Sequence, residues 1–496
     1  MTIDLSTITF TNGADIVPEF GEEDIVNTGI ANTLDGNDTI TGIGAGSNPF
    51  TPNSGYGIYN TGTLNTAEGN DIITGTARYN FFDPSPASGS GIYNTDTLNT
   101  AEGNDIITGS GERDGIYNTG TLNTAEGNDI ITAKGDYSRG IFNSGTLDTA
   151  EGNDIITATT GFSGGDGIYN TGTFNTAEGN DIITARGKFY GIYNSGKFNT
   201  ADGNDEITGI ASSFEGILIA DGSILDTGNG NDRITGKSNI GTGIYNGSIT
   251  FNTGDGNDTI EGTGYSTGIY NTGLINTGNG KDTIIANATY GYGLFNSSTI
   301  DTGDGEDIIT GSGGIKNDGT IDTGDGDDII TGSPAFSYWG NDITGLDNKG
   351  TIDTGNGNDS IIANGLFIGI DGTINTGDGM DIITSNKGIE NDGTINTGNG
   401  ADFIIANGDF KGMGSVFLEN GKDHLNGFGT GNFNGGNNQD TLELPSGSYT
   451  VGISGTTMSF TKSGVIMYTS EFEKLIAGST TYDFTSLTDG QTIVVA

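Results

Sequence analysis

One short unit of sequence returns along most of this chain, and the repetition limits the folds that the chain can adopt. The stretch GIYNTGTLNTAEGNDIITG fills residues 57–75, and closely similar copies fill residues 115–132 and 167–184. Aligned on the letters GND, the copies follow one another at intervals of 21 to 34 residues. Repeats of this length bury their apolar side chains only by stacking on their neighbours. The repetition therefore predicts a solenoid.

The shortest copy, GIENDGTINTGNGADFIIANG at residues 388–408, shows what one turn of the solenoid contains. Three extended segments, Ile389–Asn391, Thr394–Thr397 and Phe403–Ala406, are separated by Gly, Asn and Asp, which are turn residues. β-Branched residues dominate the segments and no helical period is present. We therefore predict an all-β fold, a right-handed parallel β-helix (β-solenoid) of about 15–17 rungs.

The predicted domains follow from where the repeat begins and ends. Residues 1–20 are an N-terminal capping or strand segment, residues 21–439 are the β-helix, and residues 440–496 form a β-rich C-terminal cap. Insertions fall almost entirely at one corner, between IITG and the next GIYN, as at Thr76–Ser90 and Ser333–Thr344. In solenoids such a variable corner is often the binding face.

Differences between the copies indicate which side chains point outward. The third position of GIYN is aromatic in the early copies but becomes Lys316, Asp347, Asp371 and Glu390 later, so it faces water. By the same test the residue after each GND aspartate points outward, and the next residue points inward. The two outward columns of the early copies are candidate interfaces: Tyr59, Tyr93, Tyr117, Phe142, Tyr169 and Tyr193, and Ile72, Ile106, Ile130, Ile155 and Ile182. The asparagine that ends GIYN is expected to form a ladder of stacked amides.

Charge and composition exclude several classes of function. The chain has 64 acidic against 17 basic residues and a net charge of −47, which disfavours nucleic acid and anionic membranes as partners and favours cations. Cysteine is absent and His424 is the only histidine, so thiolate chemistry and a Ser-His-Asp triad are disfavoured. We find no N-terminal signal peptide and no apolar run long enough to span a membrane.

The acidic residues stand at one place in each copy. Stacked turns would set these carboxylates about 4.8 Å apart, where they repel one another unless a cation lies between them. Calcium suits such a site because it accepts six to eight oxygen ligands in flexible geometry, including turn carbonyls. The aspartates are Asp38, Asp71, Asp105, Asp129, Asp154, Asp181, Asp205, Asp232, Asp258, Asp282, Asp307, Asp328, Asp359, Asp381 and Asp402, with Asp423 and Asp440 less clearly in the pattern. The turn glycines are Gly69, Gly103, Gly127, Gly152, Gly179, Gly203, Gly230, Gly256, Gly280, Gly305, Gly326, Gly357, Gly379 and Gly400.

The turns TGDGNDTIE, TGNGNDRIT and TGDGDDIIT resemble the calcium-binding nonapeptide G-G-x-G-x-D-x-U-x of the RTX (repeats-in-toxin) family of secreted proteins. The resemblance implies that Asp38 to Asp402 are calcium ligands. It also implies type I secretion with an uncleaved C-terminal signal, in the region that contains FEKLIAG. Early copies depart from the motif, because alanine (as in TAEGND) replaces its second glycine and a glutamate follows. Since one copy occurs per rung, we expect several Ca²⁺ ions along one edge. A metal-free stack of hydrogen-bonded turns is the alternative.

These features predict a secreted, calcium-binding structural protein that self-assembles into an extracellular filament, sheath or surface layer. Self is the expected partner, with extracellular polysaccharide as a second, and neither nucleic acid nor membrane insertion is expected. A calcium-dependent carbohydrate-binding or adhesion protein is the alternative, since tyrosines stack on sugar rings. Ice binding ranks lower, because Lys197 and Ser223 interrupt the outward column Thr63, Thr97, Thr121, Thr146 and Thr173. We do not expect an enzyme; a polysaccharide lyase or epimerase ranks last, because no constellation of residues breaks the repeat.

Overall fold

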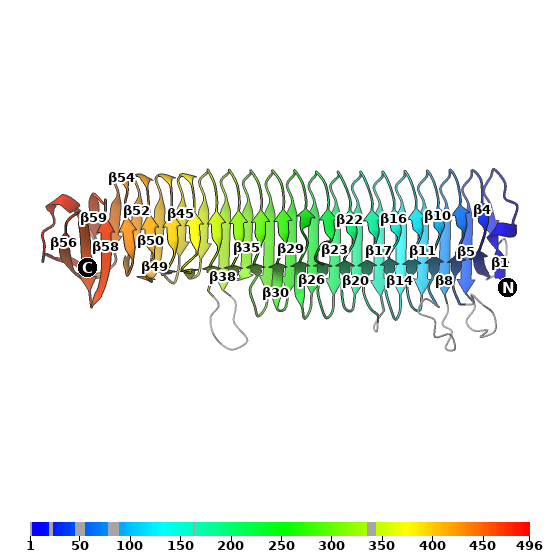
Figure 1. Cartoon of the computed structure of the whole chain (residues 1–496), viewed down its shortest axis with the longest axis horizontal. Coiled ribbons are helices and arrows are strands. Elements are labelled where there is room, and N and C mark those ends of the chain that lie inside the picture. Colours follow the sequence, from blue (N-terminus) through cyan, green and yellow to red (C-terminus); the bar gives the residue numbers. More distant parts are fainter. Residues whose placement is uncertain (1, 19–22, 45–54, 78–88, 162–163, 335–343) are drawn as a thin grey trace. The chain divides into compact units, whose positions relative to one another are not determined.

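The computed structural model describes residues 2–18, 23–44, 55–77, 89–161, 164–334 and 344–496 (Figure 1). The chain divides into two units, Met1–Tyr265 and Ser266–Ala496, and each is taken by itself below. Over the two units the chain is an all-β parallel β-solenoid of about 16 turns, as predicted. The helices in the described ranges are two single 3-10 turns, η1 (Leu5–Thr7) and η2 (Phe484–Ser486). Residues 78–88 and 335–343 of the two large insertions lie outside the described residues.

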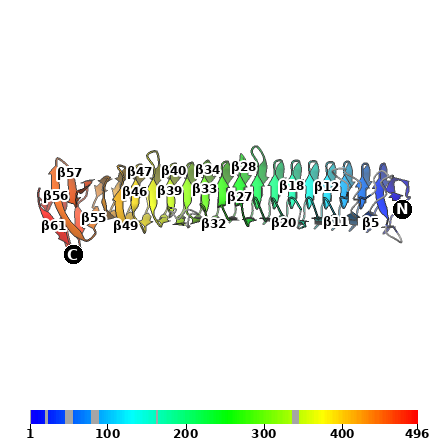
Figure 2. The same ribbon diagram turned by 90° about the horizontal axis from the view of Figure 1, so that it is seen from below.

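Each rung of the first unit contains three strands, as in β6 (Ile58–Asn60), β7 (Thr63–Asn65) and β8 (Ile72–Ala77). Each strand pairs in parallel with its copy in the next rung, and like residues pair with like: Ile58 with Ile92 and Leu64 with Leu98. Figures 1 and 2 show the copies side by side along the unit. Unbroken register places every repeated side chain in a column one rung apart.

The strands of the first unit fall into three series. The first series is β3 (Asp24–Asn27), β6, β9 (Ile92–Asn94), β12 (Ile116–Asn118), β15 (Ile141–Asn143), β18 (Ile168–Asn170), β21 (Ile192–Asn194), β24 (Ile217–Ile219) and β27 (Thr242–Asn246). The second is β4 (Ile30–Asn32), β7, β10 (Thr97–Asn99), β13 (Thr121–Asn123), β16 (Thr146–Asp148), β19 (Thr173–Asn175), β22 (Lys197–Asn199), β25 (Ile224–Asp226) and β28 (Thr250–Asn252). The third is β5 (Thr39–Gly44), β8, β11 (Ile106–Gly111), β14 (Ile130–Gly135), β17 (Ile155–Thr160), β20 (Ile182–Gly187), β23 (Glu206–Ala211), β26 (Arg233–Ser238) and β29 (Thr259–Gly264). The N-terminal strands β1 (Thr2–Asp4) and β2 (Ile16–Val17) pair with β3 and β5.

The second unit contains three series of strands of the same kind. The first is β30 (Thr267–Asn271), β33 (Leu294–Asn296), β36 (Ile315–Asn317), β39 (Leu346–Asn348), β42 (Leu366–Ile368) and β46 (Ile389–Asn391). The second is β31 (Leu274–Asn276), β34 (Thr299–Asp301), β37 (Thr320–Asp322), β40 (Thr351–Asp353), β43 (Thr373–Asn375), β47 (Thr394–Asn396), β50 (Ser415–Phe417) and β53 (Asn432–Asn434). The third is β32 (Thr283–Ala288), β35 (Ile308–Gly313), β38 (Ile329–Pro334), β41 (Ser360–Ala363), β45 (Ile382–Ser385), β49 (Phe403–Lys411), β52 (His424–Gly429), β55 (Thr441–Leu444) and β59 (Lys474–Ala477). A sheet of two-residue strands is added at the turns: β44 (Asp378–Gly379), β48 (Asn399–Gly400), β51 (Asn420–Gly421) and β54 (Asn437–Asn438).

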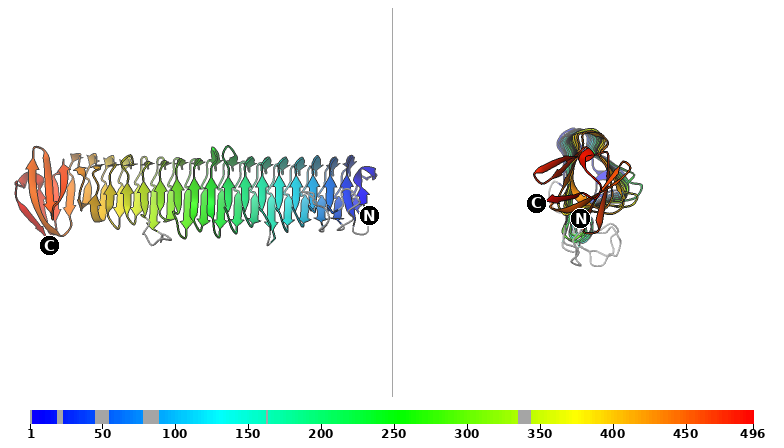
Figure 3. Two further views of the ribbon diagram at one scale, coloured as in Figure 1. Left: turned by 60° about the horizontal axis from the view of Figure 1, so that its bottom comes forward. Right: turned by 90° about the vertical axis from the view of Figure 1, so that its left-hand side faces the viewer.

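The C-terminal cap combines parallel and antiparallel pairing. β55 and β59 extend the parallel stack, while β56 (Gly447–Ser454), β57 (Thr457–Lys462), β58 (Val465–Ser470) and β61 (Thr492–Val495) pair antiparallel, as do β59 and β60 (Thr480–Asp483). Figure 3 shows these strands in orange and red at the C-terminal end of the second unit. The parallel ladder thus runs into the segment that we assigned to the cap.

The core of a rung is thin. Ile58, Leu64 and Ile73 are fully buried, and their equivalents stack above and below them. On the inner side near the variable corner, a Cβ atom on Gly75 would overlap the carbonyl of Gly91 in the next rung. The third strand of one rung and the first strand of the next therefore meet backbone to backbone, and side chains fill only the rest of the interior. This explains the glycine in both IITG and GIYN.

Our alignment of the repeats from the sequence is wrong at two positions. The residue paired between Asp347 and Glu390 is Phe367, not Asp371. The residue paired with Lys197 is Ile224, while Ser223 is buried. Both errors have one cause: these rungs carry longer turns between their first and second strands, so matching letters did not reveal which residues pair.

Candidate functional site

The GND aspartates of the first unit form one buried column at the turn before the third strand. All are nearly inaccessible to water. The backbone N–H of each aspartate donates to Oδ1 of the aspartate in the next rung; Asp71 donates to Asp105 at 2.7 Å and Asp105 donates to Asp129 at 2.8 Å. One carboxylate oxygen in each rung therefore fixes the backbone of the rung before it. These bonds are those that the metal-free alternative required.

The second unit carries the same column and shows how it ends. Asp402 donates to Asp423 at 2.9 Å, and Asp423 donates to Asp440 at 3.0 Å, so both doubtful aspartates belong to it. The N–H of Asp440 then donates to Oε2 of Glu473, a residue of the cap, at 2.8 Å. At the start of the first unit, the N–H of Asp15 donates to Asp38 at 2.7 Å. Sequence reasoning missed Glu473 and Asp15, which lie outside the repeat.

The second carboxylate oxygen, Oδ2, lies beside the hydroxyl of a buried threonine five residues earlier. In one rung Thr354 donates to Oδ2 of Asp359 at 2.6 Å. In rungs such as those of Asp71 and Asp105, Oδ2 has no hydrogen-bond donor, although the threonine hydroxyl lies close enough to lower the pKa of the carboxyl group. A buried oxygen without a donor is satisfied by a proton on the carboxyl group or by a cation.

Burial raises the pKa of these carboxyls far above the value of an exposed aspartate. The pKa rises to about 7 for Asp105 and Asp129 and to about 8 for Asp205. Loss of hydration is the largest cause, and repulsion by the neighbouring aspartates adds to it. The threonine hydroxyl and the backbone N–H of the preceding rung act in the opposite direction. Without a cation, much of the column is therefore protonated near neutral pH.

The turn backbone explains the glycines of the motif. Ala101 has a φ of 57°, and Gly228, at the position where the motif has glycine, has a φ of 75°, so the alanine copies adopt the same left-handed turn. Gly103 has a φ of 152°, and a Cβ there would overlap the carbonyl oxygen of Gly69 in the rung before. Gly69, Gly127 and, Gly280 apart, the other predicted turn glycines each lie as close to the carbonyl oxygen of the equivalent glycine in the rung before.

The outer edge of these turns is acidic and exposed. Five glutamates and then Asp202 line a shallow groove along the first unit, beside exposed asparagines such as Asn104, whose N–H donates to Oδ1 of Asn70 at 2.7 Å. The glutamates are Glu68, Glu102, Glu126, Glu151 and Glu178. Among the described residues, no three acidic or histidine side chains converge on one point. An ion at this edge would therefore combine carboxylate oxygens of adjacent rungs with main-chain carbonyls.

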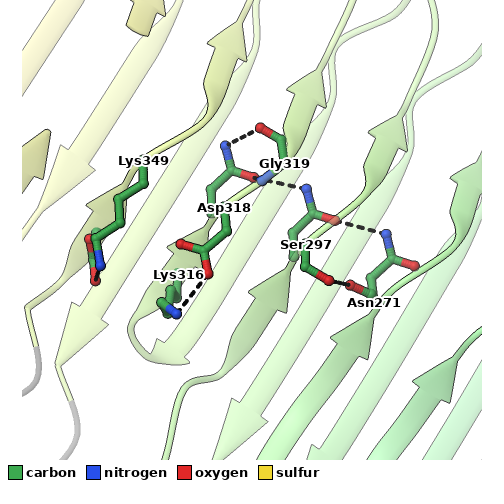
Figure 4. A network of polar contacts seen from close by, with 9 residues as sticks. Asn271, Ser297, Lys316, Asp318, Gly319 and Lys349 are labelled. Atoms are coloured by element: carbon green, nitrogen blue, oxygen red, sulfur yellow. Dashed lines mark hydrogen bonds and ion pairs between the residues drawn. The ribbon is translucent and has the colours of Figure 1, made fainter. Parts of the chain in front are cut away.

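The predicted asparagine ladder is confirmed. Asn94 donates to Asn118 and Asn118 donates to Asn143, both at 2.8 Å and both fully buried. Figure 4 shows the ladder of the second unit, where Asn271 donates to Asn296 at 2.8 Å. Beside the ladder, Lys316 occupies the position that is aromatic in the early copies, and it forms an ion pair with Asp318 at 2.7 Å. The outward position therefore accepts charge without disturbing the amides behind it.

The aromatic column points outward but is half-buried, because its rings cover one another. The ring centroids of Tyr59 and Tyr93 lie 5.0 Å apart and those of Tyr169 and Tyr193 lie 4.5 Å apart. Leu218 replaces the aromatic residue next to Tyr193. The isoleucine column is more open: Ile72, Ile130, Ile155 and Ile182 are exposed, and Ile106 is half-buried.

A third outward column consists of threonines on the second-strand series. Thr97 pairs with Thr63 and Thr121, and an outward asparagine follows two residues later in each strand. These asparagines form their own ladder, in which Asn99 donates to Asn65 at 2.8 Å. In the first unit, Lys197 and Ile224 interrupt the threonines.

Comparisons with known proteins give a likeness of fold only. No family model matches the chain and no curated protein matches it. One similar solved structure is that of a hyperactive, Ca²⁺-dependent, β-helical antifreeze protein from an Antarctic bacterium. It is 17% identical, with 72% of this chain and 86% of that chain covered and a TM-score of 0.34. The RTX resemblance of the turns stays a prediction. Within the ranges described above, no helix is long and apolar enough to cross a membrane.

Proposed function

We propose that this chain is a secreted structural protein whose turns bind calcium. The observation that carries the proposal is the buried aspartate column, in which an oxygen without a hydrogen-bond donor recurs rung after rung. Calcium between adjacent turns would satisfy these oxygens and neutralise the carboxylates. Each ion would take carboxylate oxygens from two rungs, from Asp38 through Asp402 and on to Asp440, and main-chain carbonyls of the turn.

Calcium binding would couple folding to the medium outside the cell. The ionised column is costly without the ion, because buried carboxylates of like charge lie one rung apart. Low calcium inside a cell therefore favours the unfolded chain, and high calcium outside favours the rigid solenoid. Export by a type I route, as the RTX resemblance implies, fits this order of events.

Assembly of copies side by side is the second part of the proposal. The exposed isoleucines of β8, β14, β17 and β20 form an apolar stripe with regular spacing, and the half-buried aromatic column adds to the apolar surface of the same unit. Apolar stripes of this length on a folded surface usually mark contacts. Sheet-like or filamentous layers of the protein would bury them.

Sedimentation velocity and circular dichroism, with and without calcium, test both parts. We expect calcium to produce the β-rich spectrum or raise its melting temperature, and to shift the sedimentation coefficient above that of a monomer. A chain with the same spectrum and the same monomeric sedimentation in calcium and in chelator would overturn the proposal. Magnesium at equal concentration controls for charge screening.

The threonine column favours one other candidate, ice binding, for a specific reason. Threonine hydroxyls repeat at every rung over Thr63, Thr97, Thr121, Thr146 and Thr173, and asparagine amides accompany them except at Asp148, so this polar array is regular. Thermal hysteresis of the purified protein tests it. Absence of hysteresis would remove this candidate and leave the structural role unaffected.

A further inference from the structure

The variable corner of the first unit carries a group of cations that the repeat does not explain. Lys134, Arg186 and Lys188 line one cleft, together with Asp136 and the hydroxyl groups of Ser212 and Ser213. The loops concerned follow β14, β20 and β23, at the lower edge of the unit in Figure 1. Three of the 17 basic residues of a chain with a net charge of −47 therefore meet at one surface feature.

The cations also follow the rung spacing. In the strand register, the neighbours in successive rungs are Lys134, Thr159, Arg186, Ile210 and Lys237. A basic residue therefore lies on every second rung. Two rungs correspond to about 10 Å along the stack. A linear array of this kind is suited to an extended polymer rather than to a small anion.

The central cation is not neutralised within the protein. Lys134 pairs with Asp136 at 3.0 Å and Lys237 pairs with Glu261 at 3.3 Å. The side chain of Arg186 is exposed and forms no hydrogen bond or ion pair within the described residues; only its backbone pairs, with Thr159 and Ile210. Its planar guanidinium can bind a carboxylate or sulfate group with two parallel hydrogen bonds.

Exposed aromatic residues follow the cleft residues along the chain. Tyr137, Phe189 and Phe214 directly follow the cleft residues Asp136, Lys188 and Ser213, and they are 62%, 39% and 48% exposed. The rings of Phe189 and Phe214 stack with centroids 5.4 Å apart, and the N–H of Phe214 donates to the carbonyl of Phe189. Flat apolar faces beside hydrogen-bonding cations are the groups that hold a sugar ring and its acidic substituent.

We propose that this corner binds an acidic polysaccharide, with Arg186 and Lys188 on its acid groups and Phe189 and Phe214 on its sugar faces. A nucleic acid strand is the less suitable polyanion. Its phosphates follow one another more closely than one cation per two rungs. The site lies at the opposite end of the third strand from the aspartate column, so calcium bound there acts on it only through the fold.

Binding of the full chain to defined polymers tests the proposal. The probes are hyaluronate, with one carboxylate per disaccharide, polygalacturonate, dextran sulfate, neutral dextran and an oligothymidylate. We expect the acidic polysaccharides to bind and the affinity to fall steeply with salt, while dextran does not bind. The carboxylated and sulfated probes separate the two sources of acid group. Failure of all three acidic polysaccharides at low ionic strength, or tighter binding of oligothymidylate, would overturn the proposal.

Four variants assign the binding to this corner. The double change Arg186→Gln and Lys188→Gln should weaken binding about tenfold or more, because it removes both cations assigned to the acid groups. Lys197→Gln removes an exposed cation from a different strand series and should have no comparable effect. Arg186→Lys should retain part of the affinity, and Phe214→Ser should weaken it without changing its salt dependence. Equal affinity of the double variant and the Lys197 control, with circular dichroism spectra unchanged, would refute the assignment.

Discussion

The backbone N–H of Asp105 donates to Oδ1 of Asp129 in the next rung, and the second oxygen of Asp129 has no hydrogen-bond donor. One half of each carboxyl group therefore has a structural task that an amide could also perform. The other half faces a threonine hydroxyl, which donates to it in the rung of Asp359, and elsewhere has a vacancy for a proton or a cation. Separate substitutions can distinguish these two halves.

The triple change Asp105→Asn, Asp129→Asn and Asp154→Asn tests the vacancy. Asparagine retains the Oδ1 acceptor but cannot ionise, so the chelated variant should be at least as stable as the parent at pH 8. Calcium should stabilise the variant less, because an amide is a weaker ligand. The measurement is the calcium-induced shift in melting temperature. Glu102→Gln, Glu126→Gln and Glu151→Gln alter exposed carboxylates of the same turns and should leave that shift nearly intact; an equal loss in both variants would place the ions elsewhere.

The stability of the chelated protein should depend on pH in an unusual direction. The folded pKa of the column lies near 7, as for Asp129, and the unfolded value lies near 4. The folded chain thus holds more protons than the unfolded chain between these values, so its stability is full below about pH 4 and falls as the pH rises through about 8. Urea midpoints from pH 4 to pH 8.5 in chelator measure this. Saturating calcium should flatten the decline, and a midpoint that rises with pH in chelator would contradict the buried column.

The inner amide ladder should be far more sensitive than the outer one. Asn118→Ala removes the acceptor of Asn94 and the donor to Asn143, all fully buried, and should cost about 1–3 kcal/mol. Asn123→Ala alters the partly exposed ladder on the second strand, where water replaces the lost bond, and should cost less than about 1 kcal/mol. Chemical denaturation of the two variants gives the comparison. Equal costs would show that the buried amides are not a special feature of the stack.

Two small residues of one turn should respond in opposite directions. Ala101→Gly relieves an alanine at a φ of 57° and should stabilise the chain by up to about 1 kcal/mol. Gly103→Ala places a methyl group on the carbonyl of Gly69 and should destabilise it by several times as much. Melting temperatures in calcium and in chelator measure both. A neutral Gly103→Ala change would mean that the turns are spaced more loosely than the structure shows.

The isoleucine stripe predicts an effect on assembly without an effect on folding. Ile130→Lys and Ile155→Lys together place like charges on exposed positions of adjacent rungs and should abolish association in calcium. Thr121→Lys and Thr146→Lys add the same charge to the second-strand face and should leave association unchanged. Sedimentation velocity reports the outcome. Assembly that survives the first pair and fails with the second would move the contact to the threonine column.

The sequence predicted the three strands of a rung but not which residues pair where the turns differ in length. The three strands of residues 388–408 were predictable to within a few residues, because inward isoleucines, turn glycines and one asparagine recur at fixed spacing. Phe367 and Ile224 were missed because turns of different length hide which residues pair. Glu473 completes the aspartate column from a segment outside the repeat, 33 residues beyond Asp440, and no motif marks it.

The sequence predicted which side chains point outward but not how exposed these side chains are. Substitution by Lys316 and Glu390 correctly indicated that the aromatic column faces water. Tyr93 is half-buried because its ring stacks on the rings of the neighbouring rungs. The distance between these rings cannot be read from the sequence. The corner aromatics Phe189 and Phe214 stand in loops of unequal length, so only the folded chain shows that their rings stack.

The contact of Asp440 with Glu473 has a consequence for how the protein can grow. In every earlier link, the acceptor for an aspartate N–H comes from the following rung; here the cap supplies it from its own side chain. No donor of the column is left open at this end for an incoming chain. The cap thus ends this hydrogen-bonded ladder, and copies of the protein that associate must do so by contacts other than its continuation.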